Sequence, residues 1–345
     1  MGFVVGILTY FSLMANHLVN DLDGIWHLSN FMAGDWEISL GRGLQRYADR
    51  ARFGIVSDAF NSLLTIGLFS ISNALILYTL SSAKQCVGIG TPPHNSMLCN
   101  TTHNGSSRHP IVEYLFCVIM IANPIACCSL SYSYMSVNFG LAYFCSSLSG
   151  CIICFSFFRK NKLLGMLTAA LCLSASLAFY QSYIGIFCVM CLASSIILLR
   201  MDTPIRKTLL FLGYCFITLL FAGVLYYFLV HALLHHADIS FSSYRGADQL
   251  HLSTMILQLP TTILSIYKGM WGYFWETQLF SGLEFMTCVL IALLFLYGMT
   301  FIYQFTILIR KNRSRAFLYM LLTFLLPIAS CFVMLLAVGN EMSIL

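Results

Sequence analysis

Charge is scarce along this chain. Only 9% of its 345 residues are Asp, Glu, Lys or Arg, whereas hydrophobic residues make up 59%. Soluble domains typically contain about 25% charged and about 45–50% apolar residues. So few charges cannot cover a soluble core of this size. The composition therefore excludes a soluble enzyme and predicts an all-α, polytopic integral membrane protein that forms one domain over residues 1–345.

Basic residues are also missing ahead of the first apolar run, so we expect no cleavable signal peptide. Long apolar runs recur along the rest of the chain, and a run of about 20 residues is needed to cross a membrane. On this basis we predict about nine transmembrane helices. They lie near residues 2–19, 59–81, 111–130, 137–158, 163–180, 183–199, 208–232, 286–308 and 316–338.

Lysine and arginine are rare in most turns between these spans and gather in a few of them. The three strongest basic clusters are 159–162, 200–207 and 310–315. The positive-inside rule assigns such clusters to the cytoplasmic side. With nine spans, the N-terminus is then inside, segments 20–58 and 233–285 face outside, and segment 82–110 faces the cytoplasm.

The segment 20–58 departs from this pattern, because it places arginines on the outer side. Arg42, Arg46 and Arg50 are four residues apart, which puts them on one face of a helix. Apolar residues beside them complete the pattern of an amphipathic helix in the membrane interface. Two interpretations stay open. The arginines reach lipid phosphates in general, or they bind the phosphate of one substrate, for which the planar guanidinium is suited.

Two acidic residues, Asp21 and Asp23, follow the first predicted span directly. They are solvated residues at a helix end, ligands of a cation, or catalytic bases. Glycosyl transfer from a lipid phosphate requires a base that accepts a hydroxyl proton and cationic groups that stabilise the leaving phosphate. We prefer Asp23 as the base, since Gly24 after it permits a tight turn, and take Asp21 as the second choice.

These segments resemble the GtrII-like glucosyltransferases, membrane enzymes that modify surface polysaccharides such as O-antigen. The matching pieces begin with "DLDG" at 21–24 and "WEISLGR" at 36–42. Further pieces follow in order over nearly all of the chain: "ANPIACCSLSYSYMSVNFGLAYF", "AFYQSYIG", "YRGADQLHLS" and "FLLPIAS".

The resemblance implies a GT-C-like fold and a polyprenyl-phosphate hexose, often glucose, as the donor. The reaction would take place on the outer face of the cytoplasmic (inner) membrane, with a surface glycan as acceptor and an acid of the first outer loop as base. Two features depart from the family pattern: Leu22 separates acids that are often adjacent, and an acid expected near Ser136 is missing. The chain is also short at its C-terminal end compared with the family pattern. Two alternatives follow: the chain is a truncated member of the family, or it is a divergent one.

Residues from several predicted outer segments complete the candidate site. Tyr180 and Gln181 either cap two helices or contact the acceptor. In the large outer loop, tryptophan either anchors the protein at the membrane interface or stacks on a sugar ring. The residues that we assign to substrate binding are Trp36, Glu37, Tyr180, Gln181, Arg245, Lys268 and Trp271.

Metal and redox chemistry are not indicated by the sequence. His231 and His235 have the spacing of a metal-binding pair, but Asp238 is the only acid close to them in sequence. We therefore predict no metal site and leave a divalent cofactor undecided. Most of the 14 cysteines lie in apolar spans, where cysteine behaves as a small apolar residue.

Two other classes of membrane protein compete with the glycosyltransferase. A transporter or flippase of lipid-linked glycans would have charges or Gly and Pro breaks within its spans. Here charges lie mostly at span ends, and the chain has only seven prolines. A membrane O-acyltransferase of surface glycans would use a histidine near a span end, such as His17 or His27. The sequence favours the glycosyltransferase and leaves both alternatives open.

Overall fold

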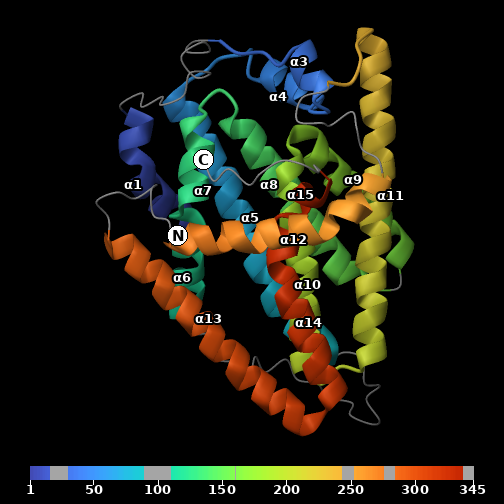
Figure 1. Cartoon of the computed structure of the whole chain (residues 1–345). Helices are drawn as coiled ribbons and strands as arrows, with labels where there is room; N and C mark the ends of the chain where they lie inside the picture. The colour runs from blue at the N-terminus through green and yellow to red at the C-terminus, as the bar shows by residue number, and fades with distance from the viewer. Residues whose placement is uncertain (16–29, 89–109, 160, 243–251, 276–283, 337–345) are drawn as a thin grey trace, which may run out of the picture.

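The chain folds as an assembly of helices (Figure 1). The computed structural model describes residues 1–15, 30–88, 110–159, 161–242, 252–275 and 284–336. Within these ranges, extended pairing is limited to one antiparallel bridge between Asn30 and Ile55. The prediction of an all-α fold is confirmed.

Six of the described helical segments are long and apolar enough to cross a membrane, and each coincides with a predicted span. They belong to α5 (Asp58–Gly88), α8 (Ser136–Ser156), α9 (Lys162–Phe179), η1 (Gln181–Tyr183) with α10 (Ile184–Arg200), α11 (Ile205–Ala237) and α13 (Glu284–Lys311). The polytopic membrane architecture is therefore confirmed by length and composition.

A seventh crossing depends on a broken helix within the predicted span 111–130. α6 (Pro110–Ile121) and α7 (Pro124–Ser131) meet at a bend of 46°. Pro124 has no N–H for helix bonding, and the Asn123 side chain caps α7 by accepting a hydrogen bond from the Ala126 N–H at 2.9 Å. The Tyr10 hydroxyl donates to the freed Ile121 carbonyl at 2.7 Å, which satisfies a polar group that has no water to bind in an apolar environment.

The two remaining predicted spans, 2–19 and 316–338, are described only in part. α1 (Gly2–Ala15) has 14 described residues, fewer than the roughly 20 that a crossing takes. α14 (Arg313–Ser330) ends at Cys331, and α15 (Phe332–Leu336) follows it. The structure thus supports six or seven spans, and the count of nine stays a prediction.

Small residues allow the central helices to pack closely. α8 is the most buried of the six candidate spans. On its contact with α9, the Ser149 hydroxyl donates to the Ala169 carbonyl at 2.7 Å, and the Ser176 hydroxyl donates to the Ala142 carbonyl at 2.8 Å. A Cβ on Gly165 would lie 2.0 Å from the Ser156 Cβ. Close approach through glycine and serine, with hydroxyls bonded across helices, is typical of helix pairs in membranes.

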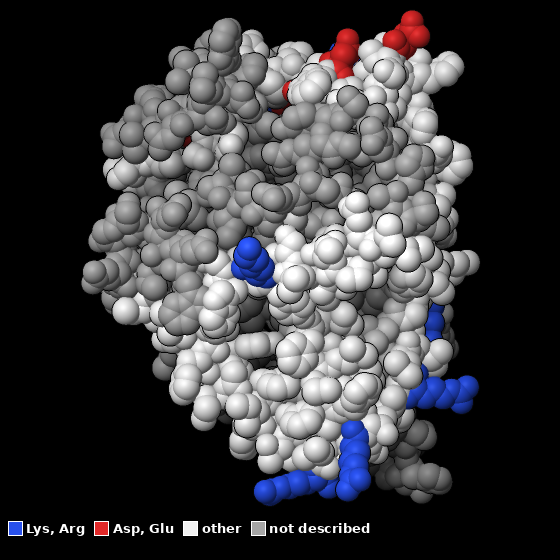
Figure 2. All heavy atoms as spheres, viewed as in Figure 1, with Lys and Arg blue, Asp and Glu red and all other residues white. Residues whose placement is uncertain are grey.

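The basic clusters gather at one end of the bundle. Asp202, in the turn after α10, accepts hydrogen bonds from Lys311 Nζ at 3.0 Å and from Arg315 Nη1 at 2.7 Å. At the opposite end, the Ser242 N–H donates to the Ser39 carbonyl at 3.0 Å. Figure 2 shows Asp and Glu at that end and Lys and Arg mainly toward the other. This separation agrees with the predicted sidedness, although which end faces the cytoplasm stays a prediction.

The helix α12 (Leu252–Trp275) falls within the predicted outer segment 233–285 but crosses the bundle at mid-height in Figure 1. It packs against α13, α14 and α15, and the Tyr267 hydroxyl donates to the Phe324 carbonyl. Its outer surface is apolar, with Leu257 81% exposed. That residues 233–285 face outside stays a prediction.

Candidate active site

The segment between residues 30 and 57 forms a cap over one end of the bundle, and we call it the cap (Figure 1). It contains two short helices, α3 (Asp35–Ser39) and α4 (Gln45–Ala51). It is attached to the bundle through backbone bonds, among them one from the Leu44 N–H to the Ala178 carbonyl at 3.2 Å. The Gln45 side chain, fully buried, donates to the Phe179 carbonyl at 2.8 Å.

The predicted amphipathic helix is interrupted inside the cap. α4 begins only at Gln45, so Arg42 lies in the turn between α3 and α4 while Arg46 and Arg50 are on the helix. Gly41 has a φ of +79°, a conformation that glycine adopts without steric cost. A Cβ at this position would lie 2.2 Å from the Tyr226 hydroxyl. The prediction of one arginine face over all three residues is wrong, because the chain must turn at Gly41 to pass Tyr226.

The turn brings Arg42 onto the two residues that sequence analysis assigned to the acceptor. The guanidinium of Arg42 lies 4.4 Å from the centre of the Tyr180 ring, a cation–π contact. Its Nε donates to Gln181 Oε1 at 3.4 Å. Residues 139 positions apart therefore meet at one place, which the sequence alone did not indicate.

Gln181 and Tyr226 fix this turn from below. Gln181 Nε2 donates to the Leu40 carbonyl at 2.7 Å and to the Tyr226 hydroxyl at 2.9 Å. The Tyr226 hydroxyl in turn donates to the Gly41 carbonyl at 3.1 Å. Tyr226 was not predicted as a site residue, and no sequence pattern sets it apart from the other aromatics of its span. The turn that carries Arg42 is thus held by η1 and α11, and its guanidinium contacts Tyr180 and Gln181.

A buried carboxylate anchors the other half of the cap. Asp49 is fully buried and accepts hydrogen bonds from the Ala33 N–H at 2.9 Å and from Asn138 Nδ2 at 3.2 Å. It also pairs with Arg52, whose side chain is only 7% exposed and which donates to the Tyr134 carbonyl at 3.2 Å. Sequence analysis expected an acid near Ser136. In the structure a carboxylate does lie beside the start of α8, but α4 supplies it.

The remaining predicted residues of the cap have local roles in the structure. Glu37 accepts a hydrogen bond from the Gly34 N–H at 2.7 Å, which closes the first turn of α3. Arg46 forms an exposed ion pair with Asp35 at 3.4 Å. Trp36 and Arg50 are exposed. Glu37 and Arg46 therefore have partners within the cap itself.

Other predicted residues lie elsewhere. Asp21, Asp23 and Arg245 fall outside the described residues. Lys268 and Trp271 are exposed on α12, which Figure 1 shows well away from α3 and α4, so the structure does not bring them to the cap. Among the described residues, no group of three or more His, Cys, Asp and Glu side chains has the geometry of a metal site.

Aromatic side chains form the floor between the cap and the bundle. Phe31 packs edge-on against Tyr134, with ring centres 4.8 Å apart, and Phe139 packs in the same way against Tyr180 at 4.7 Å. Phe31, Tyr134 and Phe139 are buried, so these ring contacts pack the cap onto the bundle beneath the Arg42 turn.

Comparison of the sequence with known protein families identifies one family. The profile of the family described as Glucosyl transferase GtrII matches residues 10–344, nearly the whole chain. No curated protein and no solved structure is significantly similar to it. The match includes the cap, the bundle helices that hold Arg42, and α12 to α15. This polytopic membrane protein therefore belongs to the GtrII family of glucosyltransferases.

Proposed function

We propose that the protein transfers a hexose, glucose by its family, from a polyprenyl-phosphate donor to a surface glycan at the cap, on the outer face of the cytoplasmic membrane. In this reaction a hydroxyl oxygen of the acceptor forms a bond to the anomeric carbon of the donor sugar. The bond from that carbon to the phosphate oxygen breaks, and the electron pair leaves with the phosphate. The hydroxyl proton passes to a carboxylate of the protein.

The position of Arg42 is the observation that carries this proposal. The Nε–H of Arg42 donates to Gln181, and the face of the guanidinium packs over the Tyr180 ring. Both terminal nitrogens are without a hydrogen-bond partner among the described residues. A guanidinium held in this way presents two N–H donors to a phosphate without first having to be ordered. Donors fixed in advance stabilise the charge that develops on a leaving group more than mobile ones do.

The base is proposed to be Asp23, with Asp21 as the alternative. Asp23 lies seven residues before Asn30, which pairs with Ile55 in the cap. Asp23 lies outside the described residues, and its choice rests on its place in the same predicted outer segment as Arg42 and directly before Gly24. Asp49 does not suit the role, because its oxygens already accept hydrogen bonds from Ala33, Asn138 and Arg52 and it is fully buried.

The family membership separates this proposal from the two alternatives raised by the sequence. Glycosyl transfer agrees with a GtrII profile over residues 10–344, whereas transport or O-acyl transfer does not. Composition analysis of the host glycan distinguishes the products, since an added hexose and an added acyl group differ in mass. We expect a hexose to be lost from the glycan when the gene is deleted and restored when it is returned.

The role of Arg42 is tested by an in vitro assay with polyprenyl-phosphate glucose and isolated acceptor glycan. Arg42→Ala should lower the transfer rate roughly a hundredfold, the loss typical when one fixed charge-stabilising donor is removed. Arg46→Ala is the matched control, because Arg46 is four residues away and forms an exposed ion pair with Asp35. A wild-type rate in Arg42→Ala would refute the proposed phosphate contact and leave this arginine with a packing role.

A further inference from the structure

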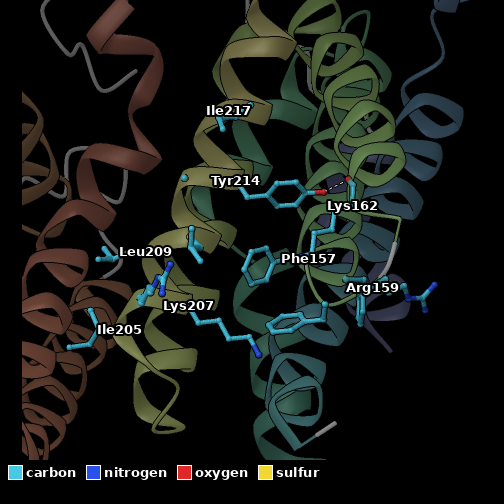
Figure 3. A pocket seen from close by; sticks show the side chains of 13 residues that line it. Phe157, Arg159, Lys162, Ile205, Lys207, Leu209, Tyr214 and Ile217 are labelled. Atoms are coloured by element: carbon cyan, nitrogen blue, oxygen red, sulfur yellow. Dashed lines mark hydrogen bonds between the residues drawn. The ribbon is translucent and has the colours of Figure 1, made fainter. Parts of the chain in front are cut away.

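A hollow of about 1250 Å³ opens at the end of the bundle opposite the cap. It lies between the end of α8, the start of α9 and the start of α11 (Figure 3). Its mouth carries four cations: Arg159 and Lys162 from the turn between α8 and α9, and Arg206 and Lys207 from the first turn of α11. None of the described residues that line it is Asp or Glu.

The charges at this mouth are not balanced by the acid closest to them in sequence. Asp202, four residues before Arg206, is paired with Lys311 and Arg315 of α13 and α14. Two of the four cations are instead held over aromatic rings. Lys162 Nζ lies 4.9 Å from the centre of the Phe157 ring, and Lys207 Nζ lies 5.3 Å from that of Phe158. Four cations therefore line one hollow, and an anion bound there would be attracted by all of them.

Behind the mouth the walls are apolar. Phe157, Leu210 and Ile217 line the hollow, and the Tyr214 side chain crosses it toward the Lys162 backbone, where its hydroxyl is bonded (Figure 3). From Arg206 to Ile217 the helix rises about 16 Å at 1.5 Å per residue. That length is close to the roughly 15 Å depth of one leaflet of a bilayer. The hollow therefore offers a cationic mouth followed by an apolar path as long as a lipid chain.

We infer that this hollow, which we call the basal groove, binds one anionic phospholipid. Its phosphate lies among Arg159, Lys162, Arg206 and Lys207, and an acyl chain follows α11 past Leu210 to Ile217. Basic pockets between transmembrane helices bind acidic head groups in this way. The N-terminus of α11 contributes in the same direction, since a helix N-terminus favours negative charge. The site is separate from the cap, so it does not depend on the proposed transfer chemistry.

The test counts lipids that stay bound to the detergent-solubilised protein in native mass spectrometry. We expect one tightly held phosphatidylglycerol per chain and no comparable binding of phosphatidylcholine with the same acyl chains. Inorganic phosphate at millimolar concentration should not displace the phosphatidylglycerol. These comparisons use the wild-type protein and so do not depend on whether a variant folds. Equal binding of both lipids, or full displacement by phosphate, would overturn the proposal.

Paired variants locate the site. Arg159→Gln with Arg206→Gln should weaken phosphatidylglycerol binding about thirtyfold, since each basic residue near a lipid head group contributes roughly a fivefold factor. Arg310→Gln with Arg313→Gln removes the same charge from the same end of the bundle, outside the groove, and should leave binding unchanged. If both pairs weaken binding equally, diffuse charge rather than the basal groove holds the lipid.

Discussion

Asp49 offers the sharpest test of the structure of the cap. Its carboxylate is fully buried and pairs with Arg52, whose side chain is 7% exposed. Asp49→Asn keeps the size of the side chain and an oxygen for the Ala33 N–H, but leaves the Arg52 charge buried without a counter-charge. Removing one partner of a buried ion pair typically costs about 3–5 kcal/mol. We expect a loss of stability of that order.

The measurement is thermal unfolding of the detergent-solubilised protein, followed by circular dichroism. Asp35→Asn is the control, because Asp35 forms an ion pair with Arg46 in the same segment, with its own side chain 64% exposed. Exposed pairs contribute at most about 1 kcal/mol, so this variant should unfold close to the wild type.

A second variant separates the ion pair from the packing around it. Asp49→Asn combined with Arg52→Gln removes both charges, so the double variant should be more stable than the sum of the two single losses predicts. Interaction energies between contacting residues reach about 0.5–3 kcal/mol in such cycles. Strictly additive losses, or an Asp49→Asn protein that unfolds like the wild type, would refute the view that this buried pair holds the cap.

Three further predictions concern other parts of the chain. Gly41→Ala should slow transfer, because its φ is +79° and its Cβ would meet the Tyr226 hydroxyl; Gly223→Ala, which has open space around it, is the control in the same assay. Asn123→Ala should cost about 1 kcal/mol in thermal unfolding through the lost cap of α7, and an unchanged midpoint would argue against that cap. Lys311, chiefly through its hydrogen bond, and Arg315 hold the pKa of the Asp202 carboxyl below its usual range. The small contribution of the ionised Asp202 to the free energy of unfolding should therefore be constant above the unfolded pKa of about 3.9 and disappear at lower pH. The difference between the unfolding midpoints of wild type and Asp202→Asn, followed from pH 8 to pH 3, measures this contribution. A difference that grows on acidification would contradict the assignment.

Much of the membrane architecture was predictable, because long apolar runs have few structural outcomes. The six spans found in the structure coincide with predicted ones. The Asn123–Pro124 pair signals a turn in the sequence, but the group that compensates the break, the Tyr10 hydroxyl, comes from another helix and has no such signal. The packing of α12 against α14 and α15 likewise has no signal in the sequence.

The candidate site was predictable in its parts and not in its assembly. Arg42, Tyr180 and Gln181 were selected for separate reasons, and nothing in the sequence indicated that they touch. Asp49 is one of several charges in the segment 20–58, and no sequence pattern distinguishes it from the others. Its burial depends on Asn138 and Arg52, and hence on how the cap sits on α8. Such long-range contacts have no periodic signal in the chain.

The central claim is that the first outer segment supplies both the base and the phosphate contact for glycosyl transfer. Asp23→Asn keeps the side chain nearly unchanged in size but removes its basicity, so transfer from polyprenyl-phosphate glucose to isolated glycan should fall by roughly 10²–10⁴-fold with an unchanged unfolding midpoint. If Asp21→Asn is inactive while Asp23→Asn transfers sugar at the wild-type rate, the base is Asp21 and the rest of the account stands. Wild-type rates in both variants would contradict the account, because neither acid of the first outer segment would then act as the base.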